Sequence, residues 1–153
     1  MTSYERILIT GGTGFVGAHM TLALRRAFTD ARIIVLARPD DAAHLPGFET
    51  LICDLTDEAS VDRVVADLAP DLVVHLAGQA SAGQAARLVE QTWRVNALAS
   101  LFLGGAIMRH APSAVMFFAS SATVYGASFH DGVLSEDARL QPLDVYARSK
   151  VAA

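Results

Sequence analysis

The chain has only one cysteine, Cys53, among its 153 residues. A single thiol cannot form a disulfide within the chain, and it has no second cysteine with which to bind a metal. No apolar run reaches the roughly 18 to 20 residues that a membrane-spanning helix needs. Residues 1–6 also lack the basic start and apolar stretch of a signal peptide. We therefore expect a cytoplasmic protein in a reducing compartment.

Basic residues are neither abundant nor clustered. The 12 Lys and Arg residues are outnumbered by 16 Asp and Glu residues, and the formal net charge is −4. Because the cations are scattered singly, the chain offers no basic stripe for nucleic acid. The five histidines are scattered too, and His75 lies within an apolar run, which favours a core histidine over a metal ligand. We assign no metal site, and we expect a small molecule as the partner.

Hydrophobic residues make up 52% of the sequence and charged residues 18%, which suits a sheet buried on both faces. The length is that of one ordinary domain. Short apolar runs predict strands at 6–10, 33–36, 51–53, 72–76 and 115–118. Helical patterns alternate with them, and this alternation predicts an α/β fold with a doubly wound parallel sheet, the Rossmann architecture.

Three features between the strands are specific enough to test. Thr56 is the expected N-cap of a helix that ends before Pro70. A single long helix is predicted from about Ala85 to about Arg109. The segment 126–142 is the one long irregular stretch, and ordered loops of that length are usually functional or mobile.

A glycine-rich turn follows the first strand directly. Gly11, Gly14 and Gly17 are spaced Gly-x-x-Gly-x-x-Gly between that strand and a helical pattern. Glycines at these positions permit a tight turn and let a pyrophosphate approach the backbone, while the helix N-terminus supplies amide hydrogens and a partial positive charge. The turn therefore predicts a dinucleotide site.

The end of the second strand commonly decides which dinucleotide is bound. An NAD site has a carboxylate there, whereas this chain has Ala37 followed by Arg38. An arginine can pair with a 2′-phosphate, which favours NADP(H) over NAD(H). The alternative is a solvated arginine at the start of a loop. Asp54, after the third strand, is expected either to accept from the adenine amino group or to be a helix-start residue beside Thr56.

A tyrosine and a lysine four residues apart share one face of a helix. Lys150 can then lie beside the phenol of Tyr146 and favour its ionised form, and such a phenol can exchange a proton with an alcohol or ketone. Ser121, after the fifth strand, offers a hydroxyl to hold that oxygen. Such a pair often consists only of neighbours on the protein surface. Ser121, however, follows the carboxyl end of a strand, and this architecture places ligands at the carboxyl ends of its parallel strands.

The long predicted helix carries both an apolar face and one amide. The apolar residues are expected to pack in the core or against a second subunit; they are Trp93, Leu98, Leu101, Phe102 and Leu103. Asn96 interrupts that face with a group that needs hydrogen-bond partners. Its predicted role is to serve an active site through water, with simple solvent exposure as the alternative.

Taken together, several motifs in order resemble one protein family. They are TGGTGFVG from Thr10, CDLTD around Asp54, HLAGQ from His75, SSATVYG from Ser120 and YARSK from Tyr146. This pattern resembles the extended short-chain dehydrogenases, specifically the nucleotide-sugar epimerase, dehydratase and reductase family, over essentially the whole chain. The resemblance implies NAD(P)-dependent oxidoreduction at C4 of a nucleotide-linked sugar.

The resemblance also implies roles for particular residues. The expected catalytic residues are Ser121, Tyr146 and Lys150, and Ser121 and Thr123 are expected to contact the sugar. The expected cofactor-binding residues, including Arg38 from the argument above, are Gly11, Gly14, Phe15, Val16, Gly17, Arg38, Asp54, Leu55, Ala77, Gly78, Asn96, Tyr146 and Lys150.

Within the family, the 4,6-dehydratases carry an Asp-Glu pair after the catalytic Ser or Thr. Ala122 and Thr123 stand there, which disfavours a dehydratase. SSATVYG resembles the UDP-galactose 4-epimerases and HLAGQ the GDP-4-keto-6-deoxymannose reductases, so both stay open. Members continue past the lysine, so residues 1–153 are expected to form the NAD(P)-binding domain without the C-terminal sugar-binding region.

Two further expectations concern activity and assembly. The family commonly forms homodimers through the long helix and the helix of Tyr146, which implies a homodimer here. The alternative to an enzyme is a truncated dinucleotide-binding module without independent catalysis.

Overall fold

The computed structural model describes residues 3–39 and 45–153. Its strands form one parallel sheet in the order β3-β2-β1-β4-β5. The strands are β1 (Arg6–Thr10), β2 (Arg32–Ala37), β3 (Glu49–Ile52), β4 (Leu72–His75) and β5 (Val115–Phe118). The chain winds outward from β1 to β3 and then returns to the other side of β1, which confirms the predicted doubly wound sheet. The strand order therefore reverses between β1 and β4, where such sheets bind ligands.

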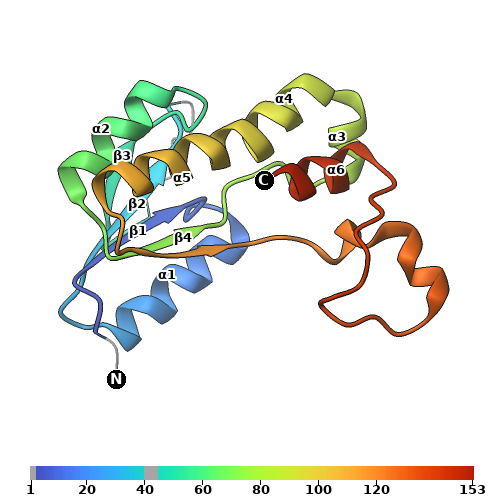
Figure 1. Cartoon of the computed structure of the whole chain (residues 1–153). Coiled ribbons are helices and arrows are strands. Elements are labelled where there is room, and N and C mark those ends of the chain that lie inside the picture. Colours follow the sequence, from blue (N-terminus) through green and yellow to red (C-terminus); the bar gives the residue numbers. More distant parts are fainter. Residues whose placement is uncertain (1–2, 40–44) are drawn as a thin grey trace.

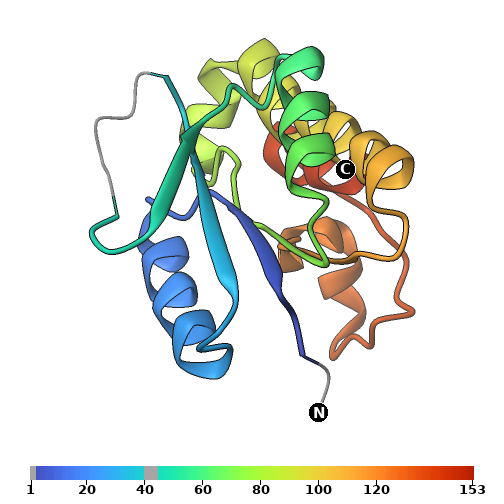
Figure 2. The same ribbon diagram turned by 90° about the vertical axis from the view of Figure 1, so that its left-hand side faces the viewer.

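Helices cover both faces of the sheet (Figures 1 and 2). Helix α1 (Phe15–Ala27) lies on one face, and α2 (Glu58–Leu68) and α5 (Ala99–His110) lie side by side on the other. Successive residues of a strand point to opposite faces. Ile7 and Ile9 accordingly join the core under α1, and Leu8 joins the core under α2 and α5.

The predicted helix from Ala85 to Arg109 is wrong in its continuity. Helix α3 (Ala82–Arg87) is followed by Leu88, whose φ of −117° and ψ of 57° are not helical. Helix α4 (Val89–Trp93) follows, and a π-helical turn, η1 (Arg94–Leu98), joins it to α5. The hydroxyl of Ser100 donates to the carbonyl of Asn96 within this stretch, and such a side-chain bond competes with the regular helical ladder.

Helix α2 begins differently from the prediction. Thr56 does not cap it, because the amide and the hydroxyl of Thr56 both donate to Oδ1 of Asp54, each at 2.8 Å. Asp57 is the cap instead, and its carboxylate accepts from the amide of Ala59. The helix therefore starts one residue later than the sequence pattern predicts.

The segment 126–142 is more regular than predicted. A 3-10 helix, η2 (Ala122–Val124), leads into a second one, η3 (Gly126–Asp131). The two ends of the segment are held together, since the amide of Ala127 donates to the carbonyl of Gln141 at 3.0 Å. Helix α6 (Val145–Ala152) follows, capped by the carboxylate of Asp144, which accepts from the amide of Ala147 at 2.7 Å. The segment is thus an ordered loop that leads to the start of α6 (Figure 1).

Candidate functional site

A cavity of about 550 Å³ lies at the carboxyl ends of the strands, where their order reverses. Four segments that are distant in sequence line it, together with two residues from the helices α4 and η1. These are the glycine turn, the ends of β2 and β3, the loop after β4, and Gln91 and Val95. The place and the lining suit an elongated ligand that crosses the sheet edge.

Two glycines of the turn leave no room for a side chain. Gly11 has a φ of +70°, and a Cβ atom there would lie 2.6 Å from the amide nitrogen of Ala77. A Cβ on Gly17 would lie 2.0 Å from the carbonyl oxygen of Gly11. Gly14 is the N-cap of α1 and has no side chain with which to cover the first amides of the helix. Uncovered amides at a helix N-terminus, together with the helix dipole, can bind an anionic group such as a pyrophosphate.

Two apolar side chains extend the same surface. Phe15 is 84% exposed and Val16 is 60% exposed, and both line the cavity at the start of α1. Such exposure places apolar area against the space that a ligand would fill. Leu55 also lines the cavity, but it is 9% exposed and belongs to the core under α2.

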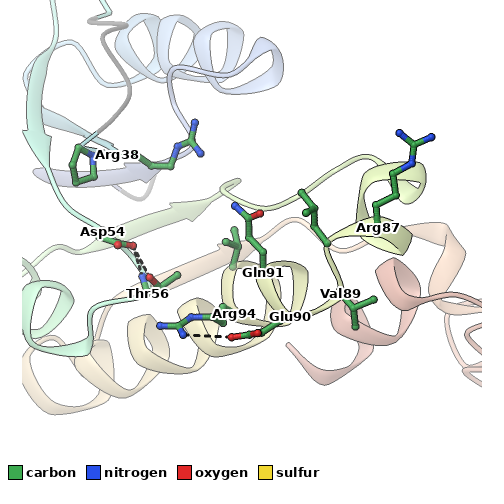
Figure 3. A pocket seen from close by; sticks show the side chains of 11 residues that line it. Arg38, Asp54, Thr56, Arg87, Val89, Glu90, Gln91 and Arg94 are labelled. Atoms are coloured by element: carbon green, nitrogen blue, oxygen red, sulfur yellow. Dashed lines mark hydrogen bonds and ion pairs between the residues drawn. The ribbon is translucent and has the colours of Figure 1, made fainter.

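Arg38 and Asp54 lie where the cavity meets a second hollow of about 690 Å³, shown in Figure 3. Arg38 and Asp54 come from the strand ends on one side, and Arg87 to Val95 come from α3, α4 and η1 on the other. Asp54 organises the turn through Thr56, as its helix-start interpretation requires, although Asp57 is the actual cap. We take the smaller cavity as the main ligand site, because only that cavity contains the glycine turn.

Cys53, which directly follows β3, is not a reactive thiol. Burial, with smaller contributions from the charges of Asp54 and Asp57, raises the pKa of Cys53 to about 11. The nucleophilic form of cysteine is the thiolate. Cys53 therefore stays a protonated thiol in the cavity wall near neutral pH.

Lys150 reaches from α6 to the end of β5. Its side chain is largely buried, and Nζ donates to the carbonyl oxygen of Ala119 at 2.9 Å and lies 5.0 Å from the centre of the Phe118 ring. Burial lowers the pKa of this ammonium. The hydrogen-bond partner of Nζ is that carbonyl, so an effect of Lys150 on the phenol of Tyr146 stays a prediction.

Ser121 and Thr123 stand just beyond this contact. The hydroxyl oxygens of the two residues are hydrogen bonded at 2.8 Å, and Ser121 also accepts from the amide of Thr123. Tyr146 is partly buried in the first turn of α6. The structure therefore brings Lys150 to the carbonyl two residues before Ser121.

Asn96 joins the cavity to α6 and is not exposed to solvent as the alternative interpretation required. It is 1% exposed, and Oδ1 accepts from the amide of Gln79 at 2.7 Å. Nδ2 donates to the hydroxyl of Ser149 at 2.9 Å and to the carbonyl of Gln79 at 3.3 Å. A Cβ on Gly78 would lie 2.9 Å from Oδ1 of Asn96 and 3.4 Å from Nζ of Lys150. The loop after β4 thus passes directly against both side chains.

Sequence reasoning missed two members of this junction. Gln79 and Ser149 both bond to Asn96, yet neither carries a charge or a residue type that indicates chemistry. The only signal was their position inside the HLAGQ and YARSK motifs.

His75 is a core histidine, as predicted. It is 1% exposed, with Nδ1 2.6 Å from the hydroxyl oxygen of Thr10 and Nε2 2.9 Å from that of Ser100. Burial, with a smaller contribution from the charge of Lys150, lowers the pKa of His75 to about 4. The imidazole is therefore neutral near neutral pH.

This histidine should make the protein less stable in acid. An unfolded histidine has a pKa of about 6.5, so between pH 6.5 and 4 the unfolded chain binds a proton that the folded chain does not. The free energy of unfolding should fall by about 2 kcal/mol at pH 5 and about 3 kcal/mol at pH 4 from this group. Denaturant unfolding of the wild type and of His75→Gln checks this. The variant should lose less stability on acidification, and parallel pH profiles would contradict the assignment.

Two kinds of site are absent from residues 3–39 and 45–153. No helix there is long and apolar enough to cross a membrane. Nor does that part of the chain gather three or more His, Cys, Asp or Glu side chains in a way that would hold a metal ion.

Comparison with known proteins agrees with this geometry. A sequence model of the NAD dependent epimerase/dehydratase family matches residues 7–153. UDP-glucose 4-epimerase from Azospirillum brasilense is 34% identical over 151 residues, which are 95% of this chain and 42% of that protein. GDP-6-deoxy-D-mannose reductase from Pseudomonas aeruginosa is 30% identical over 150 residues, 97% of this chain and 45% of that protein.

A solved structure adds the same relationship in three dimensions. UDP-glucose 4-epimerase from Thermus thermophilus, in complex with NAD, superposes with a TM-score of 0.85 at 28% identity, over 96% of this chain and 48% of that one. The chain thus spans less than half the length of these relatives. The family match and the site geometry lead to one conclusion: the chain belongs to the NAD dependent epimerase/dehydratase family.

Proposed function

We propose that this chain binds NAD(P) and carries the catalytic residues of an oxidoreduction at C4 of a nucleotide-linked sugar. The observation that carries the proposal is the meeting of Lys150 with the end of β5. Its ammonium bonds the Ala119 carbonyl at 2.9 Å and lies close to Gly78 in the wall of the dinucleotide cavity. That contact brings α6 and the strand that precedes Ser121 to one place beside the cavity.

In the oxidising direction, Ser121 would donate a hydrogen bond to the C4 oxygen and Tyr146 would take the proton from the C4 hydroxyl. Lys150 would favour the ionised phenol and hold the nicotinamide ribose. The bound dinucleotide supplies the hydride chemistry. In the reducing direction, Tyr146 would return the proton to the C4 oxygen. Thr123, bonded to Ser121, would contact the sugar.

The residues present fit a dinucleotide. Gly11, Gly14 and Gly17 would leave room for the pyrophosphate, and the first amides of α1 would face it. Asp54 and Leu55 would flank the adenine, and Ala77 and Gly78 would flank the ribose on the nicotinamide side. Phe15 and Val16 would cover the pyrophosphate from the start of α1. Asn96 would act on the cofactor through the loop that it holds.

Arg38 supports a preference for NADP(H). Arg38→Ala should raise the dissociation constant of NADPH by about 10- to 100-fold, because a charge-assisted hydrogen bond contributes about 1.5 to 3 kcal/mol. The dissociation constant of NADH should change less than about twofold, since NADH lacks the 2′-phosphate. Fluorescence titration of both dinucleotides measures this, with Arg26→Ala on the exposed end of α1 as control. Unchanged NADPH binding would return Arg38 to a solvated loop residue.

An epimerase and a 4-keto reductase differ in what happens to the dinucleotide. In an epimerase it is oxidised and reduced within one turnover, whereas a reductase consumes it stoichiometrically. The absorbance of reduced nicotinamide, followed while a nucleotide sugar is converted, separates the two. A constant absorbance with a changed sugar indicates an epimerase, and a steady loss indicates a reductase.

A second candidate is a dinucleotide-binding module without catalysis of its own. The observation that favours it is that the chain spans less than half the length of the relatives named above. This candidate predicts saturable dinucleotide binding with no conversion of any nucleotide sugar.

We also propose a homodimer through α4, η1 and α5 together with α6. The predicted apolar face divides in the structure, since Leu103 is fully buried and Phe102 packs on the core. Trp93, Leu98 and Leu101 keep 37%, 43% and 65% exposure and supply the apolar surface for a second copy. A monomeric mass in solution at micromolar concentration would count against the dimer.

A further inference from the structure

A series of hydrogen bonds runs through the buried core, from the loop after β4 to the π-helical turn η1. The amide of Ala77 donates to the hydroxyl oxygen of Thr10 at 3.2 Å, and that oxygen lies 2.6 Å from Nδ1 of His75. On the other side of the ring, Nε2 lies 2.9 Å from the hydroxyl oxygen of Ser100, which donates to the carbonyl of Asn96 at 2.7 Å. The side chains of Thr10, His75 and Ser100 are all buried. This series of hydrogen bonds therefore links the end of β1 to the π-helical turn η1.

For a neutral imidazole, which the lowered pKa of His75 indicates, only one arrangement of protons satisfies every one of these bonds. A carbonyl can only accept, so the single hydroxyl proton of Ser100 points at Asn96 and the oxygen accepts from Nε2 of His75. A neutral imidazole has one N–H, so Nδ1 must accept from the hydroxyl of Thr10. Thr10 then accepts from the amide of Ala77. The lowered pKa of His75 agrees with this neutral form.

Beyond η1 the hydrogen bonds continue to α6. The side chain of Asn96 holds both backbone groups of Gln79, in the cavity wall, and donates to the hydroxyl of Ser149. Ser149 in turn donates to the carbonyl of Tyr146 at 2.7 Å and immediately precedes Lys150. The dinucleotide cavity and α6 are therefore held to the same asparagine, and the carbonyl of that asparagine is held through His75.

We propose that His75 is a positioning residue. As the neutral Nε2–H tautomer it fixes the carbonyl of Asn96 through Ser100, and this sets where Asn96 holds the cavity loop at Gln79 against α6. The placement of Lys150 and Tyr146 then depends on a histidine that touches neither substrate nor cofactor. The catalytic consequence rests on the proposed function, whereas the tautomer and the coupling do not.

Ser100→Ala tests the link with a matched control. It removes one buried hydroxyl from a helix and adds no volume, and alanine favours helix. Thr92→Val is the control, because the hydroxyl of Thr92 is also buried and also donates to a carbonyl four residues earlier, that of Leu88 at 2.9 Å. The hydroxyl bond of Thr92 involves neither His75 nor Asn96. The two variants therefore differ in whether they interrupt this series of hydrogen bonds.

Kinetics and binding in the whole protein give the first readout. Ser100→Ala should lower kcat about tenfold while KM for the sugar and the NADPH dissociation constant stay within about twofold, because misplaced groups raise the barrier without weakening ground-state binding. Thr92→Val should leave all three within about twofold. Equal kcat values in the two variants would overturn the proposal.

Nuclear magnetic resonance gives a readout that needs no turnover. In the wild type, ¹⁵N spectra of His75 should show the proton on Nε2 and an unprotonated Nδ1, and the backbone amides of Gln79 and Ser149 should shift in Ser100→Ala but not in Thr92→Val. A proton on Nδ1, or unmoved amides in Ser100→Ala, would overturn the inference. If the wild type converts no nucleotide sugar, the proposed function fails by itself and these spectra alone decide the role of His75.

Discussion

Tyr146→Phe should lower kcat for the nucleotide sugar by roughly 10²- to 10⁴-fold, the range that a positioned general acid or base contributes. The change removes only the phenolic oxygen, which is the group that moves the proton in the proposed reaction. The ring stays, and α6 keeps its cap, since the carboxylate of Asp144 accepts from the amide of Ala147. Dinucleotide binding should therefore stay within a few-fold of the wild type, because the glycine turn is untouched.

Steady-state kinetics together with a dinucleotide titration measure this prediction. Tyr4→Phe is the matched control, because Tyr4 packs its ring against Phe28, 5.3 Å between centroids, in the core under α1. That variant should keep the wild-type kcat. Full activity in Tyr146→Phe would mean that another group moves the proton, and the proposed mechanism would be wrong.

Gly17→Ala should abolish dinucleotide binding, with a dissociation constant raised by more than about 100-fold. The added Cβ would lie 2.0 Å from the carbonyl oxygen of Gly11 and 2.6 Å from Cα of Gly12. Both neighbours are backbone atoms, so the turn itself must move. Overpacking of this kind typically costs about 1 to 3 kcal/mol of stability. A displaced turn also loses the amides that a pyrophosphate needs.

Gly104→Ala separates this effect from a general one. Gly104 also lies in a helix, α5, but a Cβ there would meet nothing within 4 Å. Alanine at this position should raise the free energy of unfolding by up to about 1 kcal/mol and leave dinucleotide binding unchanged. Titration and denaturant unfolding of both variants provide the comparison. Wild-type dinucleotide affinity in Gly17→Ala would remove the glycine turn from the site.

The sheet was predictable because its strands are continuous apolar runs that end at recognisable turns. Ile7 to Thr10 leads straight into the glycine spacing, and the apolar run at 115–118 ends before Ser121. These are local signals, and the parallel direction of the strands follows from the alternation of strands and helices. The first and last residues of the strands were less predictable. The third strand begins at Glu49, two residues before its apolar run, because its pairing with β2 extends that far.

The junction around Asn96 was not predictable, because it depends on contacts between distant segments. Asn96 and Ser149 are 53 residues apart, and Asn96 and Gln79 are 17 apart. A polar residue on an apolar helix indicates only that some partner exists. The π-helical turn likewise leaves no mark in the hydrophobic period, since it shifts the ladder by one residue over a single turn. His75 was placed correctly in the core, but its partners Thr10 and Ser100 lie on other elements.

The helix start at Asp57 shows a different limit. Thr56 and Asp57 are both good caps by residue type. The choice depends on Asp54, which takes the amide and the hydroxyl of Thr56 and so removes it as a cap. Two strong local preferences competed, and a third residue decided between them.

The most direct test of the proposed chemistry is a proton NMR spectrum of a panel of nucleotide sugars incubated with the whole protein and added NAD⁺ or NADPH. We expect at least one sugar to change at C4, either by inversion of its configuration or by reduction of a C4 ketone, and only when a dinucleotide is present. Saturable dinucleotide binding with every sugar unchanged would contradict C4 oxidoreduction and would leave a dinucleotide-binding module.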